Sequence, residues 1–172
     1  MFRVAFIGLY IQPRLQGSGG GVMAWGGISI RGKTDLVFVN GNMNAQRYID
    51  QVHQPVVQPY VANNAEDITL MDDNARPHRA RIVNDFLHNH NINRMDPWPA
   101  CSPDLNPIEH CWDEMKREIR SAFQAGDGVG QLRQHVQNAW DNITPAFVNR
   151  LIISLRRHCQ ACIRARGGHT RY

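Results

Sequence analysis

The chain has 172 residues, of which 20% are charged, and a formal net charge of +4 at pH 7. This length fits one domain with a sizeable core, and the longest apolar run, 1–11, is too short to span a bilayer and lacks a signal-peptide cleavage site. The four cysteines are too few and too irregularly spaced for a disulfide scaffold, so we expect free thiols and an intracellular protein.

The N-terminal part of the chain carries the pattern of β-strands. Residues 1–11 can form an additional strand. Residues 22–30 and 36–39 are β-rich runs around a Gly-containing turn, which predicts a hairpin. The pair Gly26-Gly27 interrupts the first of these runs and indicates a bulge.

The middle of the chain alternates helical and strand patterns. From Asn44 onward apolar residues recur near helical spacing, although Pro55 and Pro59 must kink or divide that helix. One strand is predicted at 68–72. It is followed by an amphipathic helix over 82–88 and a short strand over 92–95.

A proline-rich stretch, 97–107, separates these elements from a helical C-terminal part. Asn106 is a good N-cap and Pro107 a good first helical residue. Helical patterns then cover 108–119, 132–140 and 147–163. The order of hairpin, helix, strand, helix, strand and further helices predicts an α/β fold, with a mixed sheet covered by helices.

Two adjacent carboxylates follow the predicted strand at 68–72. Asp72 and Asp73 precede Asn74, where the chain turns toward the next helix, and the carboxyl ends of strands in open α/β sheets gather ligands. Alternation along a strand places the two side chains on opposite faces, so they cannot easily share a role. An Asp-Asn pair is also simply a good turn former.

Glu109 is the third acid of interest. It lies in the first turn of the helix that Asn106 and Pro107 begin, where the helix dipole favours a carboxylate, and stabilising that turn is its simplest role. Mg²⁺ binds through one or two carboxylates plus phosphate oxygens and water, and Asp73 is the partner that such a site requires. Two metals about 4 Å apart can activate an attacking oxygen and stabilise a leaving oxygen in phosphodiester displacement.

Several longer stretches resemble successive landmarks of mariner-superfamily transposases. They are GGGVMAWGGIS, NAQRYIDQV, MDDNARPHRA, WPACSPDLNPIEHCWDEMKR and CQACIRARGGHTRY, in the family's order. The resemblance covers 19–172, which leaves 1–18 as a non-matching N-terminal segment. It implies an RNase H-like fold and a catalytic triad of two Asp and a Glu or Asp.

Carried over to this sequence, the resemblance implies that Asp73 and Glu109 are the catalytic, metal-binding acids, with Mg²⁺ or Mn²⁺ in a two-metal site. His78 matches a family histidine and is a possible auxiliary residue, although packing or capping explains it equally well. Asp72, also a possible auxiliary residue, stands where the family usually has an uncharged polar side chain. Trp25 and Trp112 match family aromatics, and we expect both in the core.

The activity implied is cleavage of DNA at transposon ends and strand transfer into target DNA, in the nucleus, with a homodimer as the possible assembly. Arg76 and Lys116 are candidates for contacts to phosphate, against the simpler interpretation of solvated surface charge. No membrane or small-molecule substrate is implied. The arginine-rich tail is compatible with a polyanionic partner. Its members are Arg156, Arg157, Arg164, Arg166 and Arg171.

The match lacks the family's first Asp, which belongs on the first strand. No Asp or Glu precedes Asp35, and Asp35 lies beyond the hairpin turn, on the wrong strand. We therefore expect a domain incomplete at its front, with the first strand missing or replaced, that cleaves DNA poorly or not at all.

Two other classes of function stay open. The first is a non-enzymatic, transposase-derived DNA- or protein-binding module or relic, which the missing Asp favours. The second is a small zinc-binding module built from His158, Cys159, Cys162 and His169. This is the weaker of the two, because Zn²⁺ normally takes four ligands with characteristic paired spacings.

Overall fold

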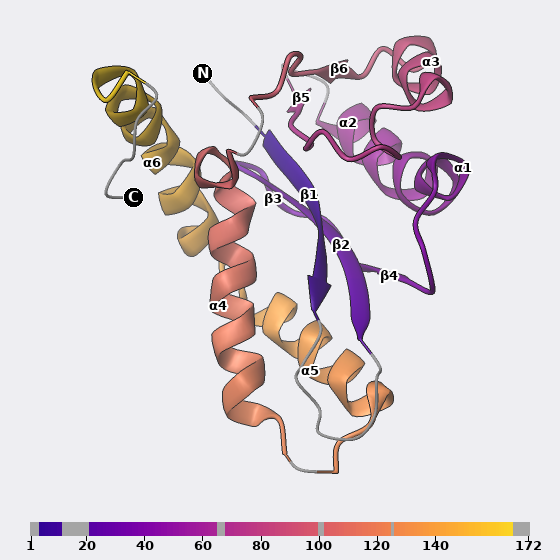
Figure 1. The fold of residues 1–172 in the computed structure, drawn as a ribbon, viewed down its shortest axis with the longest axis vertical. Coiled ribbons are helices and arrows are strands. Elements are labelled where there is room, and N and C mark those ends of the chain that lie inside the picture. Colours follow the sequence, from indigo (N-terminus) through magenta and orange to yellow (C-terminus); the bar gives the residue numbers. More distant parts are fainter. Residues whose placement is uncertain (1–3, 12–20, 65–67, 100–101, 125, 167–172) are drawn as a thin grey trace.

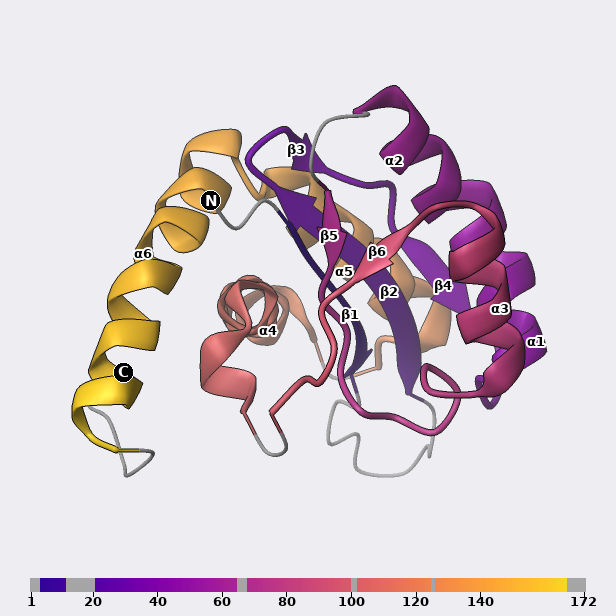
Figure 2. The same ribbon diagram turned by 90° about the horizontal axis from the view of Figure 1, so that it is seen from above.

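The computed structural model describes residues 4–11, 21–64, 68–99, 102–124 and 126–166. Its centre is a pair of small sheets, with helices on both sides (Figures 1 and 2). No helix in the described part of the chain is both long enough and apolar enough to cross a membrane.

The larger sheet is antiparallel and contains four strands. They are β1 (Val4–Ile11), β2 (Val22–Ser29), β3 (Gly32–Lys33) and β4 (Val37–Val39). β1 pairs with β2 along its whole length, from Val4 opposite Ser29 to Ile11 opposite Val22, and β3 and β4 pair with the other edge of β2. The predicted hairpin is confirmed, and residues 4–11 form the additional strand that the sequence allowed, which contains no Asp or Glu.

The smaller sheet pairs β5 (Thr69–Leu70) with β6 (Asn93–Arg94) in parallel. Met95 N extends this pairing by donating to Leu70 O at 2.8 Å. β5 lies beside β1 (Figures 1 and 2). The mixed arrangement of an RNase H-like fold is therefore present as two adjoining sheets, with β5 and β6 shorter than the sequence pattern predicts.

One group of helices covers each side of the sheets (Figure 2). On one side are α1 (Ala45–Tyr48), the wider π-helical η1 (Ile49–Val57), α2 (Gln58–Asn63) and α3 (Arg81–Asn89). On the other side are the short 3-10 helix η2 (Pro103–Leu105), α4 (Pro107–Ala122), α5 (Val129–Asn142) and α6 (Pro145–Arg164).

The prolines in the first helical stretch change its winding rather than break it. Residues 45–63 stay helical throughout, and Pro55 lies inside η1. A proline lacks the backbone N–H that an α-helix needs at that position, and the wider winding around Pro55 accommodates the residue. The expected division of this helix is therefore a change of helix type, from α1 to η1 to α2, without a gap in the helical backbone.

The two sides of the sheet have separate apolar cores. The core under α4, α5 and α6 includes Ala24, Ile28, Trp112 and Trp140, whereas Trp25 belongs to the opposite core. Trp25 and Trp112 are both 2% exposed or less, which confirms the expectation that they are core residues. The alternation along β2 therefore assigns its two faces to different helical layers.

Gly26 allows α5 to pack closely on β2. A Cβ atom at Gly26 would lie 2.9 Å from Trp140 Cη2 and 3.2 Å from Leu36 Cδ1. β2 pairs with β1 without interruption through Gly26 and Gly27, whereas its pairing with β3 and β4 is interrupted at these two residues. The bulge expected at Gly26-Gly27 therefore lies on the strand opposite β2, between β3 and β4. Thr34 bridges the interruption, since its Oγ1 accepts from Gly27 N at 2.9 Å.

Candidate active site

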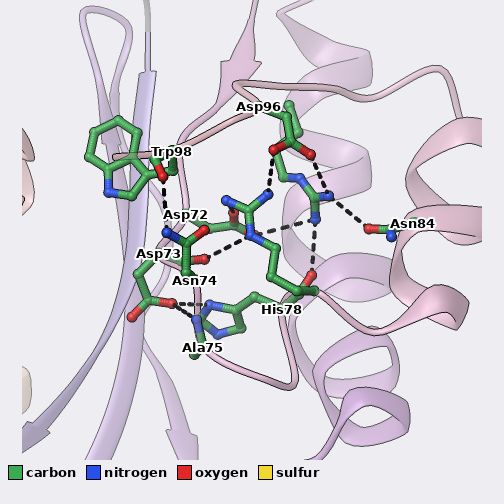
Figure 3. A network of polar contacts seen from close by, with 10 residues as sticks. Asp72, Asp73, Asn74, Ala75, His78, Asn84, Asp96 and Trp98 are labelled. Atoms are coloured by element: carbon green, nitrogen blue, oxygen red, sulfur yellow. Dashed lines mark hydrogen bonds and ion pairs between the residues drawn. The ribbon is translucent and has the colours of Figure 1, made fainter. Parts of the chain in front are cut away.

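The turn after β5 sends its two aspartates in opposite directions. Asp72 is fully buried, whereas the Asp73 side chain is 46% exposed. Asp73 Oδ1 accepts a hydrogen bond from Ala75 N at 2.9 Å, and Asn74 Nδ2 donates to Trp98 O at 3.0 Å (Figure 3). The bond within the turn is typical of Asp at such positions, whereas the bond from Asn74 ties the turn to the segment around Trp98.

His78 contacts the same carboxylate. Its Nδ1 lies 2.6 Å from Asp73 Oδ1 (Figure 3), and its ring stacks on Tyr48 with centroids 4.3 Å apart. An ionised carboxylate only accepts, so the imidazole donates. This hydrogen bond is the main cause that lowers the pKa of Asp73, and it is opposed by partial burial. Asp73 Oδ2 accepts no hydrogen bond from a described residue.

Glu109 is presented by the start of α4. Asn106 caps this helix by accepting from Ile108 N through its side chain, and Pro107 is the first helical residue, as predicted. Burial raises the pKa of Glu109, Lys116 lowers it, and Asp113 and Asp73 raise it. α4, which carries Glu109, and β5, which leads to Asp73, both contact β1, although 97–107 separates the two elements in sequence.

Asp72 has its own partners. Arg79 Nη2 lies 3.5 Å and Arg94 Nη1 4.0 Å from its carboxylate oxygens. Burial raises the pKa of Asp72 to about 6, although His78 and the two arginines act to lower it. The opposite placement of the two aspartates agrees with the alternation expected along the strand.

The arginines beside Asp72 form a network that no sequence motif indicated. Both arginines also pair with Asp96: Arg79 Nη1 lies 3.3 Å from its Oδ1, and Arg94 Nη2 lies 3.4 Å from its Oδ2. Arg94 additionally donates to His78 O at 2.9 Å and to Asn84 Oδ1 at 2.7 Å. The network ties the turn of Asp73 to β6 and α3. Arg79 lies within the stretch MDDNARPHRA, whereas Arg94 and Asp96 lie outside every stretch quoted for the resemblance.

His53 lies behind this turn, in the core on the α1 and α3 side. It is fully buried, and its ring is 4.3 Å from Tyr48 and 5.8 Å from Phe86, measured between centroids. Burial lowers the pKa of His53 to about 3, with smaller effects from His78 and Arg94 in the same direction. His53 is therefore neutral at physiological pH.

The two predicted phosphate-binding residues differ in their surroundings. Arg76 is exposed on the turn after Asp73 and has no ion pair with a described residue. Lys116 Nζ lies 3.5 Å from Asp113 Oδ1 and is close enough to Glu109 to lower its pKa. In sequence, Arg76 follows Asp73 by three residues, and Lys116 follows Glu109 by seven residues on the same helix.

The donor set of the two predicted acids suits a hard divalent cation but is small. Asp73 and Glu109 supply carboxylate oxygens, which Mg²⁺ and Mn²⁺ favour. β1, which lies beside β5, contains no acid. Within the described ranges, no group of three or more His, Cys, Asp or Glu side chains is placed to hold a metal ion, and His169 of the zinc hypothesis falls outside them.

Comparison with known proteins agrees with this geometry. A family model described as DDE superfamily endonuclease matches residues 5–129. The chain belongs to this family. The match begins inside the segment 1–18, which the sequence motifs alone did not cover.

Two transposases of nematodes are similar over 164 residues, which is 95% of this chain. They are the Tc1 transposase of Caenorhabditis elegans, at 30% identity, and the Tcb1 transposase of Caenorhabditis briggsae, at 31%. The chain spans 59% of the length of each of these relatives. The resemblance to mariner-superfamily transposases is thereby confirmed.

Solved structures confirm the fold. The catalytic domain of Mos1 mariner transposase superposes with a TM-score of 0.77 at 21% identity, over 96% of this chain and 83% of that one. The same catalytic domain solved with Raltegravir and Mn gives a TM-score of 0.78, also at 21% identity, over 97% of this chain and 84% of that one. The RNase H-like architecture expected from the resemblance is the one found.

Proposed function

We propose that this chain is the catalytic-domain part of a Tc1/mariner-type DNA transposase, in which Asp73 and Glu109 hold Mg²⁺ or Mn²⁺ against a DNA phosphodiester. The observation that carries the proposal is the match of the DDE superfamily endonuclease model to residues 5–129, a range that contains both acids. The nematode relatives are transposases, which supports the same reaction class for this chain.

A divalent cation bound at this site would polarise the phosphate and help to activate the attacking oxygen. The residues of the chain prepare the ligands. His78 fixes Asp73 Oδ1 and leaves Oδ2 open toward solvent. Glu109 is costly to ionise in its half-buried position, so a cation that compensates its charge would bind there with favourable electrostatics.

The first strand limits this activity. β1 stands beside β5, where the family's first acid belongs, but its sequence VAFIGLYI offers only apolar side chains and a tyrosine. Two carboxylates leave the cation with more water ligands and a less defined geometry than three would. We therefore propose that the 172-residue chain by itself cleaves DNA and transfers strands weakly or not at all.

The partners follow from the same proposal. DNA of transposon ends and target sites is the substrate, Arg76 and Lys116 contact phosphate near the two acids, and the nucleus is the compartment. A homodimer is the proposed assembly. A non-enzymatic DNA-binding role is the competing outcome, and it is favoured by the missing acid of β1.

Metal binding and cleavage test the proposal separately. Mn²⁺ titration, followed by water-proton relaxation, should show a site in the wild-type chain that Asp73→Asn and Glu109→Gln both weaken by tenfold or more. Asp85→Asn, on the exposed side of α3, is the control and should bind as the wild type does. Plasmid nicking in Mn²⁺ should be weak or absent, and strong nicking that Asp73→Ala abolishes would refute the proposed impairment. Salt-sensitive DNA binding without a metal site would favour the non-enzymatic role.

A further inference from the structure

Helix α6 carries positive charge without any acid to neutralise it. The helix contains no Asp or Glu from Pro145 to Arg164, and its last three turns with the two residues that follow hold four exposed arginines. None of their four guanidinium groups has an ion pair or hydrogen bond with a described residue. They are Arg156, Arg157, Arg164 and Arg166. We call residues 156–166 the arginine ridge.

Two cations of the neighbouring helix α4 have acidic partners. On α4, Lys116 pairs with Asp113 and Arg117 pairs with Glu114 at 2.5 Å. Near the end of α6, Arg164 and Arg166 have a simple structural explanation, because cations stabilise the carboxyl end of a helix. Arg156 and Arg157 lie two turns earlier, where that effect has decayed. Their exposure without partners is therefore the informative feature.

The arginine ridge begins beside the candidate active site. The His158 ring lies 5.9 Å from the ring of His110, measured between centroids, and His110 directly follows Glu109. α6 also contacts η2, the short helix that leads into α4. Figure 2 views α4 close to its axis, with the C-terminal half of α6 running past its start. Arg156 and Arg157 thus lie within one turn of His158, the α6 residue whose ring is near that of His110.

Most of the apolar side of α6 is buried. Val148, Ile152 and Leu155 lie in the core with Trp112 and Trp140. Ile153 and Ile163 are exposed, but they lie ten residues apart and form no continuous apolar side, which a helix on a membrane requires. The ridge spans about 15 Å at 1.5 Å per residue, and a DNA duplex offers one phosphate charge about every 1.7 Å along its axis. The planar guanidinium group is well suited to phosphate oxygens.

We infer that the arginine ridge binds the phosphate backbone of duplex DNA and holds the duplex next to Asp73 and Glu109. This rests on the proposed function, since it takes DNA as the substrate of that site. The contacts are to phosphates, so they position the duplex without reading its sequence.

The test compares two double variants with the same loss of charge. Arg156→Gln/Arg157→Gln removes the ridge residues nearest Glu109, and Arg117→Gln/Arg120→Gln removes two exposed arginines from the far half of α4. Binding of a 30-bp duplex of arbitrary sequence is measured by fluorescence anisotropy between 50 and 200 mM KCl. The slope of log K against log salt is negative, and each arginine that no longer neutralises a phosphate should make it less steep by about 0.9.

In the ridge variant the slope should be less steep by about 2, and binding should weaken equally for unrelated sequences. The α4 variant should leave the slope unchanged. Equal slopes for ridge variant and wild type would overturn the inference, as would the same decrease in the α4 variant. Binding of poly-glutamate as tight as that of DNA would also overturn it, because the ridge would then fit any polyanion. Mn²⁺ affinity should stay at the wild-type value in the ridge variant, so failure of the metal site and failure of the ridge are distinguishable.

Discussion

His78 donates a hydrogen bond to Asp73 from within the same turn, with Nδ1 and Oδ1 2.6 Å apart. The imidazole is almost fully buried and packed against Tyr48, so its direction is fixed before any cation arrives. A ligand that is oriented by a neighbouring group binds metal more tightly than one that must be immobilised on binding. His78 is in this account a positioning residue for Asp73.

Two substitutions at His78 separate the hydrogen bond from the ring. His78→Ala removes both, and we expect Mn²⁺ affinity to fall by about tenfold. His78→Asn also removes the ring but keeps an N–H donor near the position of Nδ1, so its affinity should stay within about threefold of the wild type. Metal titration of the two folded variants gives the comparison. Equal weakening in both would mean that the ring, and not the hydrogen bond, matters.

His53 should make the fold sensitive to acid. Its pKa is about 3 in the folded chain against an ordinary value of 6.5, so between these values the unfolded chain binds the proton that the folded chain excludes. Stability is then lost as pH falls through this window. At about 1.4 kcal/mol per pKa unit, the loss by pH 4.5 is up to about 3 kcal/mol.

Substitution of His53 provides the measurement. His53→Phe keeps an aromatic ring between Tyr48 and Phe86 and cannot be protonated. Urea unfolding at pH 7.5 and pH 4.5 should show a smaller loss of unfolding free energy in the variant than in the wild type. The same pH dependence in both proteins would show that His53 is not the group responsible.

Gly26 should tolerate no larger side chain. The added methyl of Gly26→Ala would meet Trp140 at 2.9 Å, and this ring is fixed by its hydrogen bond from Nε1 to Thr34 O. We expect a loss of about 1–3 kcal/mol in unfolding free energy. Gly130→Ala is the matched control, because nothing lies within 4 Å of its Cβ position in α5 and alanine favours a helix. A neutral Gly26→Ala would contradict the close packing of α5 on β2.

The missing acid can be supplied on β1. The register places Ile7 opposite Gly26 and Leu9 opposite Ala24, and Ala24 belongs to the core beneath α4. Residues directly opposite in antiparallel strands share a face. An Asp introduced at position 7 or 9 would therefore stand in register with β2 residues that pack on the α4 and α5 side of the sheet.

We expect Ile7→Asp or Leu9→Asp to increase Mn²⁺-dependent plasmid nicking at least about tenfold over the wild-type chain. Phe6→Asp is the control, since position 6 stands opposite Gly27, one place out of that register, and should gain nothing. Glu109→Gln added to the active variant should remove the gain. If an Asp at position 6, 7 or 9 leaves nicking unchanged in all three variants, the missing acid of β1 is not what limits the reaction.

The sequence predicted the starts of helices correctly where it contains capping residues. Asn106 and Pro107 begin α4 as expected, and Thr144 caps α6. The winding of η1 was not predictable from Pro55 alone, because a proline can break, kink or widen a helix according to what packs around it.

The two site acids emerged from the family motifs, and their residue types alone would also fit a turn and a helix start. Arg79, Arg94 and Asp96 were missed because they meet only through the fold, across α3 and β6. The replacement of the first strand by β1 was an open alternative, since an apolar run of eight residues pairs equally well in many sheets.

Cleavage of the polypeptide by bound iron tests the shared cation site most directly. Fe²⁺ with ascorbate and peroxide cuts the backbone next to the place where the metal binds. The account predicts cuts in two separate segments, around 73 and around 109, and the loss of both sets of cuts in Asp73→Asn and in Glu109→Gln. Cuts at only one segment, or cuts at 73 that persist unchanged in Glu109→Gln, would contradict it.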